Sequence, residues 1–208
     1  HMDTKGVAQF EAWKKAGVMK DYLILFSMFS SSRTYDMWVT LYFDRFADIG
    51  KWADVEKKFP GGLSAEGLKL ATPDGTVFTD VPWMGGSRKA DLAKSVFMII
   101  PYRTLVPVSK YEEYTNAYVI PQLKGWVNST VMPSYEIHQN INPTNAPWDI
   151  LMVFEYDGLR GIALRDTIKN DIRKDLLNDD GYKKYSPIKL NFRKEDEPTT
   201  YVPILPKK

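Results

Sequence analysis

Residues 125–157 read GWVNSTVMPSYEIHQNINPTNAPWDILMVFEYD, and residues 12–44 read AWKKAGVMKDYLILFSMFSSSRTYDMWVTLYFD. The two segments align without a gap at an offset of 126 − 13 = 113 residues. Chance would give roughly two identities over such a span. The identical pairs are Trp13/Trp126, Val18/Val131, Met19/Met132, Tyr22/Tyr135, Ile24/Ile137, Asp36/Asp149 and Asp44/Asp157. The sequence therefore predicts that one structural unit occurs twice.

The second copy shows the clearer pattern of elements. A buried strand is predicted over 96–106, followed by a helix over 109–131 that Pro121 should kink. Alternating segments predict strands over 135–141 and 148–156, joined by a loop over 142–147. A helix over 161–177 and a strand over 188–192 complete a β-α-β-β-α-β order. That order is the ferredoxin-like unit.

The first copy supplies a helix (7–16), two strands (22–29 and 37–43) and a second helix (49–59), but its opening strand is missing. Residues 76–81 could be its last strand or a replacement for the missing one. The Gly- and Pro-rich stretch 61–90 is interpreted as a surface connection rather than a lid, although Trp83 and Met84 lie within it. The predicted domains are therefore 3–90, with this linker, and 91–208.

Two such units with aromatic, alternating central strands resemble the dimeric α/β-barrel superfamily in its tandem form. The resemblance covers residues 7–59 and 96–192 and includes no diagnostic catalytic motif. It implies an α+β fold in which two ferredoxin-like modules pack as a barrel, the first module apparently lacking its first strand. Members include cofactor-free monooxygenases, small-molecule isomerases and cyclases, aldoxime dehydratases and haem enzymes. Fold alone does not choose among these activities.

Composition excludes several classes of function. The absence of cysteine excludes thiolate nucleophiles and cysteine-ligated metals, and a net charge of +2 gives no field to attract nucleic acid. No apolar run approaches 18 residues, so neither a membrane span nor a membrane partner is expected. His1-Met2 looks like a cloning remnant. The compartment stays open, and a signal peptide removed upstream would make the protein periplasmic or secreted.

The two copies differ on one face of their shared second strand. In copy one this face carries Leu23, Leu25, Ser27 and Phe29, and in copy two it carries Glu136, His138, Asn140 and Asn142. The other face is mostly apolar in both copies and is expected to lie under the helices. The polar face would then line the barrel. A solvated strand face is the alternative, and burial would decide between them.

His138 is the candidate general acid or base, since it is the only histidine besides His1. Glu136 would orient its ring, and Asn140 would stabilise a developing oxyanion. No serine or cysteine nucleophile motif accompanies these residues, so a hydrolase triad is not expected. The candidate substrate-binding residues are Arg103, Tyr102, Glu155, Arg193 and Trp83. One histidine is too few for a histidine-rich metal site, and neither metal nor cofactor is expected.

The sequence thus favours a cofactor-free enzyme of lyase, isomerase or monooxygenase type. Aromatic residues make up 13% of the chain, which favours an apolar or aromatic small-molecule substrate. The alternative is a non-catalytic ligand-binding or assembly module. Homo-oligomers are expected in that case because of the exposed strand edges and the missing first strand.

Overall fold

The computed structural model describes residues 1–29, 34–142 and 147–206. Its contacts divide the chain into two units. The first unit comprises residues 1–76 with 202–208, and the second comprises residues 77–201. Residues 79–86 pair with a strand of the second unit. The predicted domain boundary at residue 90 stays a prediction.

The first unit has one helical layer on a strand pair. Its elements are the π-helical turn η1 (Met2–Gly6), α1 (Val7–Lys15), β1 (Asp21–Ser27), β2 (Met37–Tyr42), the 3-10 turn η2 (Phe46–Asp48), α2 (Ile49–Glu56) and the 3-10 turns η3 (Pro60–Gly62) and η4 (Gly67–Lys69). β1 and β2 are antiparallel. The backbone N–H of Ile204 donates to the Ile24 carbonyl at 2.8 Å, which brings the C-terminal segment beside β1.

The core of the first unit lies between α1, α2 and one face of β1. Val7, Phe10, Ile24 and Trp52 are buried there, and Tyr22 packs against them. The face of β1 that the sequence assigned to the helices is therefore the face that they cover. This follows from strand alternation, since Tyr22 and Ile24 point the same way.

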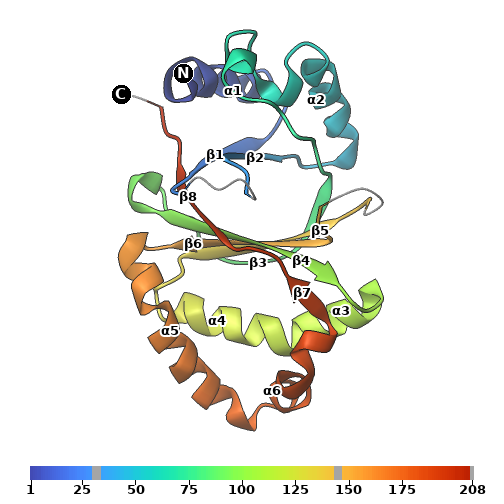
Figure 1. Cartoon of the computed structure of the whole chain (residues 1–208), viewed down its shortest axis with the longest axis vertical. Coiled ribbons are helices and arrows are strands. Elements are labelled where there is room, and N and C mark those ends of the chain that lie inside the picture. Colours follow the sequence, from blue (N-terminus) through green and yellow to red (C-terminus); the bar gives the residue numbers. More distant parts are fainter. Residues whose placement is uncertain (30–33, 143–146, 207–208) are drawn as a thin grey trace. The chain divides into compact units, whose positions relative to one another are not determined.

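In the second unit the strands β7, β4, β6, β5 and β3 form an antiparallel sheet in that order, and residues 199–201 of β8 also pair antiparallel with β4. Its elements in chain order are β3 (Thr79–Gly86), η5 (Leu92–Lys94), β4 (Val96–Thr104), α3 (Val108–Tyr114), η6 (Thr115–Val119), α4 (Ile120–Asn128), β5 (Ser134–Asn140), β6 (Ile150–Tyr156), α5 (Gly158–Asp175), η7 (Leu176–Asn178), α6 (Asp180–Tyr185), η8 (Ser186–Asn191), β7 (Arg193–Glu195) and β8 (Thr199–Pro203). Helices α3 to α6 lie on one face of this sheet (Figure 1). Without β3, the sheet has the strand order of a ferredoxin-like unit.

The predicted elements of both copies are present with small shifts. Adding 113 residues to the bounds of α1 and β1 gives 120–128 and 134–140, which are the bounds of α4 and β5. The duplication itself stays a prediction.

The predicted strand over 188–192 is wrong, because a 3-10 turn occupies 186–191 and the strand begins at Arg193. The predicted loop over 142–147 lies mostly outside the described residues.

The stretch 76–81 does not belong to the first copy. Residues 79–86 form β3, which pairs with β5 as an additional edge strand of the second unit. The prediction of a last or replacement strand for copy one is therefore wrong. The interpretation of 61–90 as a surface connection along its whole length is also wrong, because β3 lies within it. A hydrophobicity pattern does not specify which sheet edge a strand joins.

Pro121 acts as expected, but through a π-helical turn rather than a simple kink. The helix predicted over 109–131 is divided into α3, the π-helical turn η6 and α4, and Pro121 lies in the first turn of α4. Proline has no N–H to donate to the preceding turn, and the widened turn accommodates its ring. The first of these helices begins at Val108, one residue before the predicted start, with Pro107 at its N-cap position.

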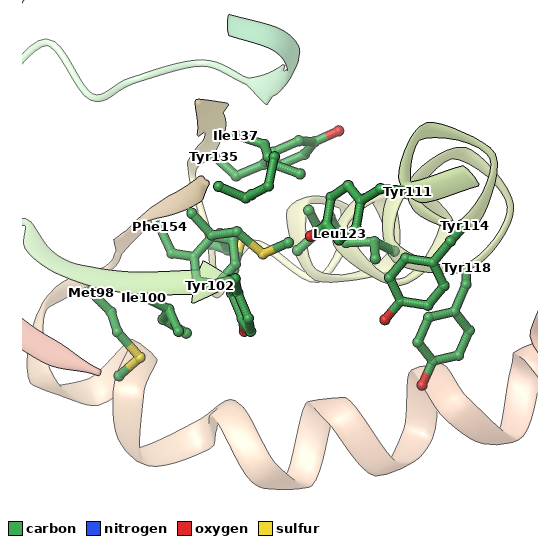
Figure 2. Packing of buried hydrophobic residues seen from close by; sticks show 14 of the residues in the cluster. Met98, Ile100, Tyr102, Tyr111, Tyr114, Tyr118, Leu123, Tyr135, Ile137 and Phe154 are labelled. Atoms are coloured by element: carbon green, nitrogen blue, oxygen red, sulfur yellow. The ribbon is translucent and has the colours of Figure 1, made fainter. Parts of the chain in front are cut away.

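The core of the second unit is rich in tyrosine. Tyr102, Tyr135 and Phe154 from the sheet meet Tyr111, Tyr114 and Tyr118 from the helical layer (Figure 2). Tyr114 stacks on Phe192 with ring centroids 4.8 Å apart. Large aromatic side chains bury much apolar surface, so this layer contributes strongly to the stability of the unit.

Glu113 links α3 to α6 by hydrogen bonds, and its ionisation makes the free energy of unfolding depend on pH in the acid range. Its carboxylate accepts from Lys184 at 2.7 Å and from the Tyr185 hydroxyl at 2.6 Å. Lys184, then Tyr185 and Lys110, lower the pKa of Glu113 to about 2. A depressed folded-state pKa stabilises the fold above the ordinary carboxyl pKa, and that contribution is lost as pH falls toward 2.

We therefore expect Glu113→Gln to have a lower melting temperature than the parent protein at pH 7. The gap should narrow as pH falls from about 4.5 toward 2, because protonation removes the same interaction from the parent. Thermal melts by circular dichroism across this range measure it. A gap that is constant with pH would contradict the assignment, and added salt should shrink the gap at pH 7 because the carboxylate is exposed.

Candidate acid–base site

The two faces of β5 differ in the second unit. Tyr135 and Ile137 point into the helix-covered core. Glu136, His138 and Asn140 lie on the opposite face, where His138 is 4% exposed and Asn140 is 8% exposed. His138 and Asn140 are therefore buried, and the side chain of Glu136 is 12% exposed. That this strand face lines a pocket stays a prediction.

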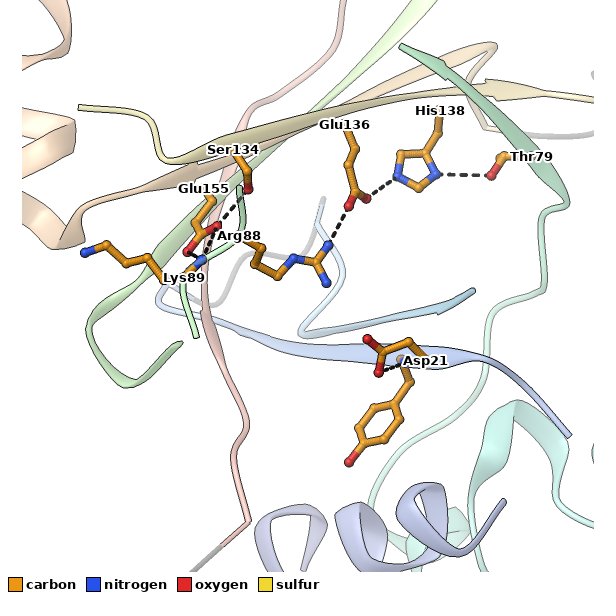
Figure 3. A network of polar contacts seen from close by, with 9 residues as sticks. Asp21, Thr79, Arg88, Lys89, Ser134, Glu136, His138 and Glu155 are labelled. Carbon is orange, nitrogen blue, oxygen red and sulfur yellow. Dashed lines mark hydrogen bonds and ion pairs between the residues drawn. The ribbon is translucent and has the colours of Figure 1, made fainter. Parts of the chain in front are cut away.

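His138 lies in a chain of four polar side chains (Figure 3). Its Nε2 is 3.1 Å from Glu136 Oε2, and its Nδ1 is 3.1 Å from the Thr79 hydroxyl. Arg88 Nη2 donates to the other Glu136 oxygen at 2.6 Å. Both nitrogens of the ring and both oxygens of the carboxylate thus have partners.

The contacts assign a tautomer to His138. An ionised carboxylate only accepts hydrogen bonds, so Nε2 carries the proton toward Glu136. In the neutral ring Nδ1 is then the acceptor, and the Thr79 hydroxyl donates to it. The basic lone pair of the imidazole therefore points to Thr79. Arg88 balances the Glu136 charge in this partly buried cluster.

A bulge in β3 brings Thr79 to this site. Thr79 is paired with Asn140 and Trp83 with Ile137, so four steps along β3 match three along β5. The extra residue reverses the alternation of side chains, and Thr79 and Trp83 point to opposite faces. Without the bulge, Thr79 and Trp83 would point to the same face of the sheet. Thr79 could then contact His138 only if Trp83 left the helix-covered core.

A tight turn after β3 brings Arg88 to the site. Gly86 has φ +75°, and the Ser87 N–H donates to the Pro133 carbonyl at 2.9 Å. The positive φ favours glycine. The turn sends the chain back over the sheet, so that Arg88 reaches Glu136. Neither Thr79 nor Arg88 was predicted from the sequence, since no periodic signal marks them within a Gly- and Pro-rich stretch.

Glu155 anchors the same turn, because both of its carboxylate oxygens accept hydrogen bonds. It is 1% exposed and accepts from the hydroxyls of Ser95 at 2.6 Å and Ser134 at 2.7 Å. The Lys89 N–H donates to it at 3.2 Å. These contacts give Glu155 a structural role, and substrate binding by it stays a prediction.

Two of the other candidates have contacts that compete with the roles expected of them. The amide of Asn140 donates to the Trp148 carbonyl at 3.1 Å and accepts from the Asn142 N–H at 2.9 Å. It therefore stabilises the end of the strand, and its role at a developing oxyanion stays a prediction. Arg103 is exposed and pairs with Asp149 at 3.3 Å. Arg88 is the cation that pairs with Glu136, and substrate binding by Arg103 stays a prediction.

Three candidates lie on the other face of the sheet. Tyr102 and Trp83 pack in the helix-covered core, and Trp83 Nε1 donates to Asn116 at 2.8 Å. The guanidinium of Arg193 lies over the Tyr102 ring at 4.2 Å. Strand alternation separates them from His138, so they do not join one site with it.

A hollow of about 370 Å³ occurs elsewhere in this unit, between α4 and α5. Gly125, Ile168 and Ile172 are among its lining residues, and none of the predicted site residues is. It lies on the outer helical layer, away from the one buried histidine. The chemistry of the side chains therefore identifies the candidate site, and the size of this hollow does not.

The donor set does not suit a metal ion or haem. Within residues 1–29, 34–142 and 147–206 no three His, Cys, Asp or Glu side chains group as metal ligands. A haem ligand needs an accessible nitrogen, whereas both nitrogens of His138 contact side chains of the protein. In the part of the chain that the structure describes, no helix has the length and apolarity to cross a membrane.

Comparisons with known proteins show the fold. No family model matches the sequence, and no curated protein matches it. The structure is similar to an anthrone oxidase-like protein, with a TM-score of 0.57 and 12% identity over 95% of this chain and 83% of that one. It is also similar to a "putative monooxygenase" from Lactobacillus acidophilus, with a TM-score of 0.55 and 12% identity over 96% and 84% of the two chains.

A third similar structure is a haem-binding protein from Thermus thermophilus, with a TM-score of 0.52 and 9% identity over 95% of this chain and 77% of that one. Together with the strand order, these likenesses confirm the predicted α+β ferredoxin-like fold. At such identities they say nothing of the activity.

Proposed function

We propose that the cluster of Thr79, Arg88, Glu136 and His138 is a metal-free acid–base site that removes a proton from a small molecule. One observation carries this proposal: the buried imidazole has Nε2 held by a carboxylate and its basic Nδ1 directed at a hydroxyl. Glu136 would stabilise the imidazolium that forms when Nδ1 takes a proton. Arg88 would keep Glu136 ionised and oriented toward the ring, and would offset negative charge on the substrate.

A weakly acidic carbon is the substrate group that best suits this arrangement. A C–H beside an electron-withdrawing group would lose its proton to Nδ1, directly or through the Thr79 hydroxyl. Reprotonation elsewhere would give an isomerase, and loss of a leaving group would give a lyase. Reaction with dioxygen would convert CH2 to C=O and release water, as in a cofactor-free monooxygenase. The anthrone oxidase-like and monooxygenase neighbours favour testing the third outcome first.

Anthrone is a suitable probe because its CH2 group is acidic and its oxidation needs only dioxygen. Hydrogen–deuterium exchange into anthrone under nitrogen isolates proton removal, and oxygen uptake under air measures oxidation. We expect His138→Gln to lower the protein-dependent exchange rate by roughly 10²- to 10⁴-fold, since it removes the base. Thr79→Val, a change of similar shape, should lower the rate less if the substrate reaches Nδ1 directly.

The exposed Lys124→Ala variant on α4 is the control and should keep the parent rate. Should anthrone not be turned over, other enolisable ketones are screened in the same exchange assay. Activity that survives in His138→Gln, with folding verified by circular dichroism, would exclude histidine as the base.

A non-catalytic role is the second candidate, and a specific observation favours it. Both nitrogens of His138 already have protein partners, and Thr79 links β3 to β5 through this ring. In that case the cluster only holds the edge strand and the following turn. His138→Gln would then lower the melting temperature while no enolisable ketone is processed by the parent protein. Assembly into homo-oligomers stays a prediction that light scattering can test.

A further inference from the structure

The hollow of about 370 Å³ between α4 and α5 has an apolar floor, and its volume is in the range of pockets that hold small organic molecules. Pro121 of α4 and Ile168, Ile172 and Leu176 on the opposing side contribute the apolar side chains. Ile168 and Leu176 also pack against the core, and Ile172 is buried. The floor is therefore held in place by the surrounding structure and can shield hydrocarbon from water.

The charged side chains that line this hollow are both acidic. Asp171 and Asp175 are four residues apart on α5, so their carboxylates lie on one side of the helix. Asp171 is 3.4 Å from Lys174, and both side chains are exposed, so this pair contributes little. No ion pair within residues 1–29, 34–142 and 147–206 includes Asp175. The carboxylate of Asp175 is thus available to a cation from outside the chain.

The C-terminal ends of the two helices add to this negative potential. α4 ends at Asn128, and both Asn128 and its C-cap residue Ser129 line the hollow. α5 ends at Asp175, at the same hollow. The C-terminal end of a helix carries a partial negative charge and favours a cation. The last turn of α4 has no basic residue, whereas Arg173 and Lys174 in the last turn of α5 offset part of this charge without lining the hollow.

A cation with an apolar body suits these walls best. An anion would be repelled by the two carboxylates and by the helix ends. A bare metal ion would find only two carboxylates and would gain nothing from the apolar floor, since hard cations are bound by six or more oxygen ligands. An uncharged apolar molecule would use the floor and leave the carboxylates without a partner.

We propose that this hollow binds a small organic ammonium ion, with its hydrocarbon part on the apolar floor and its N–H groups directed at Asp171 and Asp175. Hydrogen bonds between an ammonium and a carboxylate are charge-assisted and stronger than those of a neutral hydroxyl. α4 and α5 cover the face of the sheet opposite to His138 (Figure 1). The site is therefore independent of the acid–base cluster, and either proposal can fail without the other.

Three probes of similar shape and different charge test this proposal. The cation 2-phenylethylammonium, the neutral 2-phenylethanol and the anion 3-phenylpropionate are titrated into the parent protein at constant ionic strength. Amide chemical shifts of Gly125, Ser129 and Ile172, measured by NMR, report binding at the hollow. We expect the ammonium to bind about tenfold more tightly than the alcohol, and the carboxylate to bind least, because only the ammonium pairs with the acids. No shift changes at these amides with the ammonium, or equal affinities for ammonium and alcohol, would overturn the proposal.

Variants assign the charge preference to the two acids. Asp171→Asn combined with Asp175→Asn should lower the affinity for the ammonium about tenfold, to that for the alcohol, and leave the alcohol unchanged. Both positions are exposed, so the fold should be kept. Asp180→Asn is the matched control, because Asp180 is an exposed acid of the same unit that does not line the hollow. It should keep the parent affinities. An unchanged ammonium affinity in the double variant would contradict the role of these carboxylates.

Ile168→Trp tests the hollow itself. The larger side chain should occupy part of the space between α4 and α5 and weaken both the ammonium and the alcohol. Parent-like binding of both probes by a folded Ile168→Trp protein would place them elsewhere and overturn the proposal. If this variant does not fold, the double asparagine variant still decides, since its changes lie at the exposed rim.

Discussion

Replacing Glu155 by alanine is expected to destabilise the protein by about 3 kcal/mol or more, since several buried donors lose a charged acceptor together. The hydroxyls of Ser95 and Ser134 and the N–H of Lys89 all donate to this carboxylate. Glu155 itself is 1% exposed, so water does not readily replace it. Urea unfolding followed by fluorescence measures the loss. The turn that carries Arg88 should also loosen, and activity dependent on His138 should fall.

Glu112→Ala is the matched control for this experiment. Glu112 lies on α3 and is exposed, so its replacement should change stability by less than about 0.5 kcal/mol. A second comparison adds Ser95→Ala and Ser134→Ala to Glu155→Ala. Removing the stranded donors should recover part of the lost stability, because the cost comes largely from leaving them unpaired. Equal losses in Glu155→Ala and Glu112→Ala would contradict the anchoring role.

Gly86→Ala is expected to have an effect of similar size, about 3 kcal/mol, for a steric reason. A Cβ at this position would lie 2.1 Å from the carbonyl oxygen of Pro133, and the residue has φ +75°. Backbone cannot move aside as a flexible side chain can, so β3 would separate from the start of β5. Arg88 would then lose its approach to Glu136.

Gly17→Ala separates the two causes. Gly17 also has a positive φ, +69°, but a Cβ at this position would have no other atom within 4 Å beyond its neighbours in the chain. Its replacement should cost only the left-handed backbone conformation, about 1 kcal/mol. The excess in Gly86→Ala then measures the collision with Pro133. Equal costs for both variants, measured by urea unfolding, would show that the turn after β3 adapts to a side chain.

Much of the fold could be predicted from local patterns. The alternation around Tyr135 and Ile137 predicted β5 and the face that the helices cover, and both are as expected. The order of elements in the second copy was sufficient to predict the ferredoxin-like unit. The strand over 188–192 failed because a short segment after a helix has no period long enough to distinguish a 3-10 turn from a strand.

The candidate site was predicted only in part. Glu136 and His138 were found because they are two apart on one strand, which puts them on one face by geometry alone. Thr79 and Arg88 come from a segment about 50 residues away. Their arrival depends on strand pairing and on a bulge, neither of which a local pattern specifies.

The sequence by itself thus determined the elements, the covered face of each central strand and the unequal polarity of the two copies. Only the tertiary structure decided which residues meet His138, because those contacts are made between strands distant in the chain. The tertiary structure also shows that Tyr102 and Arg193 are not near His138, because they lie on the opposite face of the same sheet. Periodicity fixes which way a side chain points along its own strand, and pairing between strands fixes its neighbours.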